Sequence, residues 1–344
     1  MIRFNCDYSE GAHERILKKL AETNLEQTPG YGEDHYCMEA ADIIRKLCGR
    51  EDAAVHFLVG GTQANLTVIS SALRSHQGVA GAVSAHINVH ETGAVEATGH
   101  KVLALPSEDG KITAEQVEAL YEAHIQDESF EHTVQPKMVY ISLPTELGTI
   151  YTRAELERLY QVCQSRHMYL FVDGARLAYG LAASGNDLDL ASLSANCDVF
   201  YIGGTKVGAL FGEAVVILND ELKEDFRYHI KQRGGMLAKG RLLGIQFGEL
   251  LRDGLYFELG AHADRLADKI RSACVEKGYP FLVENTTNQV FPIMPDSLLD
   301  KWKDKYSYTN QGRVDSSHTA IRLCTSWTTS GEQVDMLVND ILNS

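Results

Sequence analysis

The sequence has few of the features that mark disordered, secreted or membrane-spanning chains. Only 7 of the 344 residues are proline, and 23% are charged against 44% hydrophobic, which excludes a disordered chain. No apolar run is long enough to cross a bilayer. The first residues lack the apolar stretch of a secretory signal. We therefore expect a folded, cytoplasmic protein with one large domain and one smaller domain.

Cysteines are few and scattered. The seven cysteines are odd in number, and no two stand at the CxxC spacing of zinc sites. This distribution disfavours both a disulfide framework and a cysteine-based metal site. We expect reduced thiols and no bound metal.

Basic charge is also in short supply. The chain has 32 Lys and Arg residues against 47 Asp and Glu residues, which gives a formal net charge of −15 at pH 7. An acidic protein is a poor general ligand for nucleic acids or for anionic membranes. The simplest interpretation of the charge is solubility, so we expect no nucleic-acid or membrane partner.

What the sequence does contain is a regular alternation of short apolar runs and helical patterns. Such alternation predicts an α/β fold with buried parallel strands covered by helices. The helix predicted at 152–166 begins with a capping-box pattern, Thr152 followed by Glu155. The predicted strands are 53–59, 101–106, 137–143, 168–173, 198–204 and 212–218, and the other helices lie near 63–73 and 113–124.

The end of the chain has a different pattern. A long helical stretch near 236–276 is followed by short apolar segments separated by turns, which is typical of a smaller α+β domain. Gly240, Gly244 and Gly248 fall on one face of that helical stretch and predict close helix packing. We expect an N-terminal arm and helix at 1–30, a large domain at 31–245 and a small C-terminal domain at 246–344.

A glycine-rich segment follows the apolar run at 53–59. It reads Gly60-Gly61-Thr62-Gln63 and leads into a helical pattern. Glycines allow a close approach of the backbone to a ligand, and a helix N-terminus favours an anion. The segment fits a phosphate site, and an ordinary strand-to-helix turn is an equally good interpretation. Walker A and GxGxxG patterns are absent, so nothing favours a nucleotide.

Asp173 and Lys206 follow two later apolar runs. Ligands of open α/β sheets bind at the carboxyl ends of the strands, so both side chains are expected near one site. A buried Asp needs a cationic partner such as a protonated pyridine nitrogen; the alternative is a helix cap. A partly desolvated Lys is a usable nucleophile because its pKa is lowered; the alternative is an exposed loop lysine.

A further polar segment begins at His86. A flat imidazole can stack on a cofactor ring, and a hydrogen-bonded structural role is the alternative. A phosphate site, an Asp and a Lys at successive strand ends together provide three attachment points for one small aromatic phosphate.

These motifs resemble the threonine aldolase family of fold-type I pyridoxal-phosphate enzymes, which is grouped with the β-eliminating lyases. The resemblance spans nearly the whole chain and implies a large domain with a mostly parallel seven-stranded sheet. VDGAR at 172–176 and the position of Lys206 are the most specific matches. The others are YGED at 31–34, GGTQAN at 60–65, the segment from His86 to Ala94, GGM at 234–236 and IRLCT at 321–325.

The resemblance implies roles toward pyridoxal 5'-phosphate. Lys206 would hold the cofactor as a Schiff base and act as acid and base. Asp173 would keep the ring nitrogen protonated, and His86 would stack on the ring. The residues that would bind the phosphate end are Gly61, Thr62 and Gln63, with Arg176 also among the cofactor-binding residues.

The resemblance also implies residues for an amino-acid substrate. Arg176 and Arg322 would bind its α-carboxylate, because planar guanidinium groups match carboxylates. His132 would contact the substrate hydroxyl and serve as its base. Tyr31 and Lys231 would reach the site of a neighbouring subunit. The family forms such sites at subunit interfaces, so a homodimer or homotetramer is expected.

The departures from the family pattern lie near the substrate. Cys6 stands where the family has a serine, with Ser9 close by, and the segment Ser142–Glu146 replaces the family's Glu-Asn-Thr-His-Asn. The expected reaction is cleavage of threonine or allo-threonine to glycine and an aldehyde. The alternatives are β-elimination on another amino acid and a non-catalytic protein that retains the fold.

Overall fold

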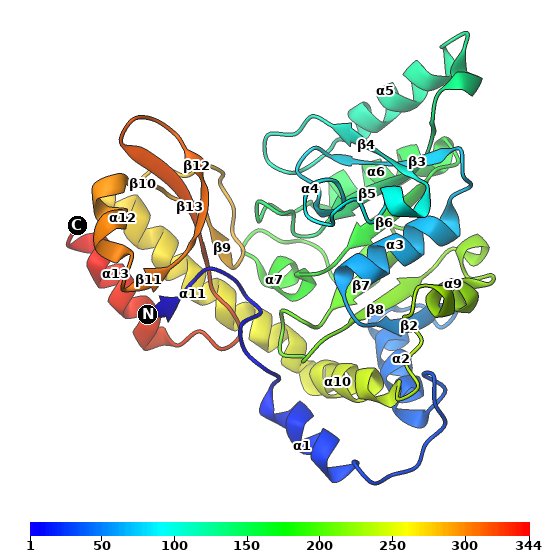
Figure 1. Ribbon diagram of the computed structural model, residues 1–344, viewed down its shortest axis with the longest axis horizontal. Helices are drawn as coiled ribbons and strands as arrows, with labels where there is room; N and C mark the ends of the chain where they lie inside the picture. The colour runs from blue at the N-terminus through cyan, green and yellow to red at the C-terminus, as the bar shows by residue number, and fades with distance from the viewer.

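The computed structural model describes all residues, Met1–Ser344, and contains a seven-stranded, a four-stranded and a two-stranded sheet (Figure 1). The large sheet has seven strands in the order β2-β8-β7-β6-β5-β3-β4. Only β8 runs antiparallel to its neighbours, so the predicted mostly parallel sheet is confirmed. Its strands are β2 (Ala54–Leu58), β3 (Gln77–Ala82), β4 (Lys101–Leu105), β5 (Gln135–Ser142), β6 (Tyr169–Asp173), β7 (Val199–Gly203) and β8 (Glu213–Ile217).

Helices connect these strands and cover the sheet (Figure 1). The capping box predicted for one of them is present: Glu155 N–H donates to Thr152 Oγ1 over 3.3 Å, and Thr152 N–H donates to Glu155 Oε2 over 2.8 Å. The helices are α2 (His35–Cys48), α3 (Gly61–Ala72), α4 (His86–Val89), α5 (Ala114–Ile125), α6 (Arg153–Ser165), α7 (Leu177–Ala182), α8 (Leu190–Ser194), α9 (Phe226–Gln232) and α10 (Arg241–Leu251), with 3-10 turns η1 (Glu96–Thr98), η2 (Phe130–His132) and η3 (Asp220–Leu222).

The four-stranded sheet is antiparallel and lies beside the last helices. Strand β13 pairs with β10, β12 and β9, and the N-terminal strand β1 pairs in parallel with β11. Both termini therefore lie in this part of the molecule (Figure 1). Its elements are β1 (Ile2–Arg3), β9 (Gln289–Val290), β10 (Ile293–Pro295), β11 (Tyr306–Ser307), β12 (Thr309–Arg313), β13 (His318–Cys324), α12 (Asp296–Trp302) and α13 (Gly331–Leu342).

The long helical stretch predicted near 236–276 is divided into two helices. Helix α10 is separated from α11 (Leu255–Lys277) by the 3-10 turn η4 (Arg252–Gly254), where Asp253 and Gly254 adopt left-handed backbone angles. Gly244 lies against α2, and a Cβ added to it would stand 2.5 Å from the Cys37 backbone nitrogen. The predicted close packing of this glycine face is confirmed.

Two hydrophobic cores meet within α11. Ala263 belongs to the core of the large domain, whereas Leu266 belongs to the core of the small domain, together with Phe4 of the N-terminal arm. The arm continues into helix α1 (Glu14–Glu22), which packs near α10. We propose that the small domain begins within α11 rather than at residue 246, and that it includes the first residues of the arm.

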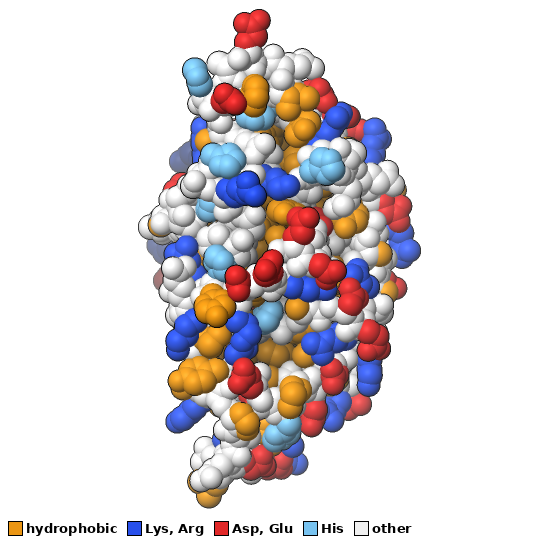
Figure 2. Space-filling model, turned by 90° about the vertical axis from the view of Figure 1, so that its right-hand side faces the viewer, with side chains coloured by type: hydrophobic (Ala, Val, Ile, Leu, Met, Phe, Trp, Pro, Cys, Tyr) orange, Lys and Arg blue, Asp and Glu red, His pale blue; other side chains and the backbone are white.

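The surface agrees with the charge of the sequence. Acidic and basic side chains are interspersed over the face drawn in Figure 2, with hydrophobic side chains showing between them. None of the helices is both long and apolar enough to span a membrane.

Candidate active site

A cavity of about 220 Å³ opens at the carboxyl ends of the parallel strands. Asp173 ends β6 and lies in register with Ser142, the last residue of β5. Both residues line the cavity, together with loops that follow β2 and β7. The cavity brings together most of the residues predicted from the sequence: Gly61, Thr62, His86, Asp173, Arg176 and Lys206.

The N-terminus of α3 forms one wall. The helix is capped by Gly60, which offers no side-chain hydrogen bond, so the first-turn N–H groups stay free for a ligand. A Cβ at Gly61 would lie 3.1 Å from Tyr201 Oη, so this approach suits glycine. Gln63 does not line the cavity, because its amide donates to Arg233 O over 3.0 Å and accepts from Val59 N–H over 3.2 Å.

Asp173 forms the floor of the cavity. Its Oδ2 accepts from Tyr140 Oη over 2.5 Å and from Asn65 Nδ2 over 3.2 Å, and its Oδ1 accepts from Ala175 N–H over 2.9 Å. Burial and the nearby Asp173 charge raise the pKa of Tyr140 well above its usual value, so its hydroxyl remains a donor. These three hydrogen bonds hold the carboxylate in one orientation at the cavity.

His86 is held by a buried carboxylate. Its Nδ1 lies 2.8 Å from Glu91 Oε1, and Asn65 Nδ2 donates to the same oxygen over 2.7 Å. The Glu91 side chain is fully buried, whereas 37% of the His86 side chain is exposed. Asn65 therefore links the supports of His86 and Asp173, which places the ring and the carboxylate in a fixed relation.

Lys206 lies in the turn that follows β7. Burial lowers the pKa of its amine, and the positive charge of Arg176 lowers it further. Tyr179 Oη donates to the Lys206 carbonyl over 2.5 Å and fixes the turn. No hydrogen bond or ion pair joins Nζ to another side chain, so the amine is free to react in the cavity.

Glu213 lies beside Lys206. It begins β8 and pairs in register with Gly203 at the end of β7. Burial raises the pKa of its carboxyl group, and Lys206 opposes that shift. Its Oε2 atom is buried without a hydrogen-bond partner, so this oxygen can still accept a hydrogen bond at the cavity wall.

Arg176 pairs with a buried acid from the N-terminal arm. Its Nε and Nη2 donate to the two carboxylate oxygens of Asp7 over 2.8 Å and 3.0 Å. Asp7 also accepts from Asn288 Nδ2 over 3.0 Å. This bidentate pair leaves Nη1 of Arg176 available for a ligand.

The other residues predicted for the substrate lie outside this cavity. Arg322, on β13, donates to Asn5 O over 3.0 Å and to Gln289 Oε1 over 3.2 Å. Ser9 is exposed and lies 3.1 Å from Cys6 Sγ. Both residues belong to the region where the arm meets the small domain.

His132, predicted as the base for the substrate hydroxyl, does not line the cavity of the single chain. His132 ends η2 and is exposed just before β5 begins, whereas the cavity lies at the other end of that strand. The eight residues of β5 span roughly 26 Å at about 3.3 Å per residue. The imidazole thus lies at the amino ends of the strands, opposite the cavity.

Tyr31 lines a second cavity rather than this one. It is 47% exposed, and Lys231 Nζ lies 4.8 Å from the centre of its ring. Tyr228 and Met236 lie in the same exposed region. This arrangement leaves the tyrosine on the outside of the chain, where a second subunit could contact it.

Several residues of the site were not assigned a role from the sequence. Tyr140 could have been found because it stands two positions before Ser142 on β5 and so points to the same face. Glu213 is the first residue of β8, and its sequence neighbours, a glycine and an apolar run, give no sign of its role. Glu146 lines the cavity and accepts from Ser142 Oγ and from His86 N–H, both over 2.8 Å.

Comparison with known proteins identifies a matching family and similar sequences. Residues 7–296 match the family model for β-eliminating lyases. The chain is 31% identical to a low specificity L-threonine aldolase from a Pseudomonas species and 29% identical to another from Pseudomonas aeruginosa, covering 98% of this chain and 96% of each relative.

Solved structures give the same picture. The structure of a threonine aldolase from Leishmania major is similar at 43% identity and a TM-score of 0.97, over 100% of this chain and 99% of that chain. An aspartate aminotransferase from Thermus thermophilus is similar in fold alone, with 15% identity and a TM-score of 0.72 over 100% of this chain and 91% of that one.

Proposed function

Since the chain belongs to the β-eliminating lyase family, among its threonine aldolases, we propose that it cleaves a β-hydroxy-α-amino acid into glycine and an aldehyde. Threonine or allo-threonine is the proposed substrate, and pyridoxal 5'-phosphate is the proposed cofactor. The observation that carries the proposal is the free amine of Lys206 in one cavity with the fixed carboxylate of Asp173.

The residues of the cavity fit this cofactor. Lys206 offers an unpaired amine, and the N-terminus of α3 offers unpaired N–H groups for a phosphate. Asp173 offers a carboxylate for a protonated ring nitrogen, and His86 offers a flat ring held from behind by Glu91. When bound, the group supplies an electron sink for the bond that breaks at the α-carbon.

The protein's own side chains then bind and orient the substrate. Arg176 keeps Nη1 for the α-carboxylate, because Asp7 uses only its Nε and Nη2. Lys206 supplies the proton that the α-carbon receives after the bond to Cβ breaks, a role that suits an amine whose pKa burial has lowered. Arg322 remains a proposed second contact for the carboxylate, reached across the arm.

Product analysis tests the proposal. Purified protein with pyridoxal 5'-phosphate should release glycine and acetaldehyde in equal amounts from threonine or allo-threonine. Lys206→Ala should lose the visible absorbance of the lysine-bound cofactor and the aldehyde release, whereas Lys303→Ala, which changes an exposed lysine, should keep both. Ammonia and a keto acid as the products would support β-elimination instead, and a colourless protein would support a non-catalytic role.

We also propose that the protein is cytoplasmic and acts as a homodimer or homotetramer. The family resemblance supports an interface close to the site. The exposed aromatic side chains of Tyr31 and Tyr228, 47% and 76% exposed, mark one surface of the isolated chain that a second copy would cover.

A further inference from the structure

The carboxyl group of Glu146 lies in the same cavity as Lys206, His86 and Asp173. It belongs to the loop that follows β5. Its Oε1 accepts from Ser142 Oγ and from the backbone N–H of His86, both over 2.8 Å. These two donors fix one oxygen, and the side chain remains half-buried at the cavity wall. A carboxyl group is thereby presented to whatever the cavity binds.

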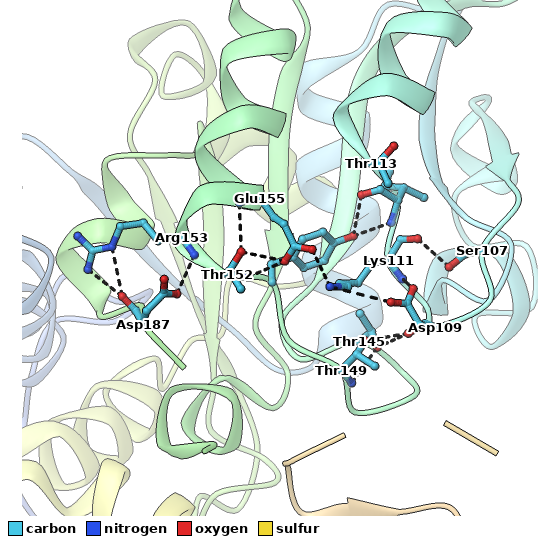
Figure 3. Close-up of polar contacts among 12 residues, drawn as sticks. Ser107, Asp109, Lys111, Thr113, Thr145, Thr149, Thr152, Arg153, Glu155 and Asp187 are labelled. Atoms are coloured by element: carbon cyan, nitrogen blue, oxygen red, sulfur yellow. Dashed lines mark hydrogen bonds and ion pairs between the residues drawn. The ribbon is translucent and has the colours of Figure 1, made fainter. Parts of the chain in front are cut away.

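The loop around Glu146 is fastened on both sides. Thr145 Oγ1 and Thr149 Oγ1 lie 2.6 Å apart, and Thr149 Oγ1 donates to Asp109 O over 2.8 Å (Figure 3). From the direction of the small domain, Asn285 Nδ2 donates to Leu147 O over 2.8 Å. Because its neighbours are held in this way, Glu146 has a fixed position before any ligand arrives.

The other protonatable groups of the cavity already have other roles or keep one protonation state. Lys206 and Asp173 are needed by the cofactor, and Arg176 stays cationic. Burial and the charge of Asp173 raise the pKa of Tyr201 well above its usual value, so its hydroxyl keeps its proton. Burial raises the pKa of Glu213, and the positive charge of the neighbouring Lys206 opposes this shift.

Among the residues that line this chain's own cavity, two candidates for proton transfer at the substrate hydroxyl remain, His86 and Glu146. The imidazole already has Nδ1 in a hydrogen bond to Glu91 and offers its face to a ring. Beyond accepting from Ser142 Oγ and from the His86 backbone N–H, the carboxyl group of Glu146 makes no hydrogen bond. With the other groups assigned, Glu146 is the better candidate for this proton transfer.

We propose that Glu146 is the catalytic base that removes the proton from the substrate β-hydroxyl. This inference rests on the proposed aldol cleavage. The hydroxyl proton passes to a Glu146 oxygen, and the electron pair of the O–H bond becomes the second bond of the aldehyde carbonyl. The Cα–Cβ bond breaks, its electron pair stays with Cα, and Cα receives a proton to give glycine. In the reverse direction Glu146 is the acid.

The surroundings of the group agree with this role. Burial raises the pKa of the Glu146 carboxyl group, and the neighbouring Asp173 charge raises it further, although the hydrogen bond from Ser142 opposes both. A carboxylate with a raised pKa is a stronger base. The titratable groups around it are His86 on α4, Tyr140 on β5, Tyr151 before α6 and Asp173 on β6. Arg176, Lys206 and Glu213 line the same cavity.

Glu146→Gln tests the inference, because the amide oxygen can still accept from Ser142 and His86 but takes up no proton. With threonine, kcat should fall by about 100-fold or more, the usual contribution of a general base. The cofactor absorbance, the unfolding temperature and the affinity for glycine measured by absorbance titration should not change. Glycine α-proton exchange in D₂O should also persist, because it involves no hydroxyl. Glu146→Asp should restore part of the cleavage rate.

Two controls separate the possible failures. Glu128→Gln, which makes the same change at an exposed position outside the cavity, should cleave threonine at the wild-type rate. If wild-type protein cleaves threonine and Glu146→Gln does so equally fast, the inference is wrong while the proposed function stands. Equal losses of cleavage and glycine exchange would assign Glu146 a structural role instead. A wild-type protein that releases no aldehyde would overturn the proposed function itself.

Discussion

Asp7 connects the N-terminal arm to the site through a single buried ion pair. Its side chain is fully buried against Arg176, which is itself largely buried. Burial alone would raise the pKa of Asp7, but the Arg176 charge and the hydrogen bonds outweigh it and lower the value from 3.8 to about 2. The pair holds the guanidinium through its Nε and Nη2 and leaves Nη1 without a bond to Asp7.

Asp7→Asn should destabilise the protein by about 3–5 kcal/mol at pH 7, because it leaves a buried guanidinium unpaired. Since the folded pKa is depressed, the stabilisation by Asp7 is present above about pH 3.8 and is lost as the pH falls toward about 2. Urea unfolding across this pH range measures it. The difference between wild type and variant should shrink toward pH 2, and the exposed Asp304→Asn should show no difference at any pH.

Most of the residues proposed to bind the cofactor were named from the sequence, whereas the residues that support them in the cavity were not. Asp173 and Lys206 stand at strand ends, a position that the apolar pattern reveals directly. Glu91 and Asn65 support the site through contacts between different loops, and sequence spacing gives no such contacts. His132 was predicted from a loop whose position relative to β5 the sequence did not define, and it lies before the start of that strand.

Gly174 allows β6 and β7 to approach at the site. A Cβ at this position would stand 1.9 Å from the Tyr201 carbonyl oxygen, which is backbone and has little freedom to move. The glycine also separates Asp173 from Ala175, whose N–H donates to that carboxylate over 2.9 Å. The close approach of two strands therefore determines where the floor of the cavity lies.

Gly174→Ala should destabilise the protein by about 1–3 kcal/mol or more, as expected when a methyl group is forced into a packed interior. It should also weaken the affinity for pyridoxal 5'-phosphate, because Asp173 has to move with the strand. Calorimetry with and without cofactor measures both effects. Gly331→Ala, where a Cβ meets open space, is the matched control and should change neither.

The predictability of an element depended on its composition. Strands β5 to β8 are continuous apolar runs and were predicted within a few residues of their bounds. Strand β3 reads Gln-Gly-Val-Ala-Gly-Ala and is wholly buried, yet its small residues give little strand signal. Strand β12 reads Thr-Asn-Gln-Gly-Arg and forms through pairing with β13, so its tertiary context determines the structure.

At the scale of the whole molecule, self-association is the main prediction. Light scattering at neutral pH should give a mass two or four times the 38.0 kDa of one chain. Replacing the exposed Tyr228 by Asp should shift the mass toward that of the single chain, since a charge in a buried interface is costly. The exposed Leu25→Asp is the control. A wild-type mass of 38.0 kDa would rule out the proposed assembly.

The order in which the chain is synthesised determines when the contacts that hold Asp7 can form. Strand β1 pairs with β11 at Tyr306–Ser307, and Phe4 packs in the core of the small domain. Both contacts hold the segment that carries Asp7. On the ribosome, the first residues must therefore wait until nearly the entire polypeptide has emerged. A translation product that stops before residue 306 would contain Lys206 and Asp173 but would lack the partner strand that secures Asp7 against Arg176.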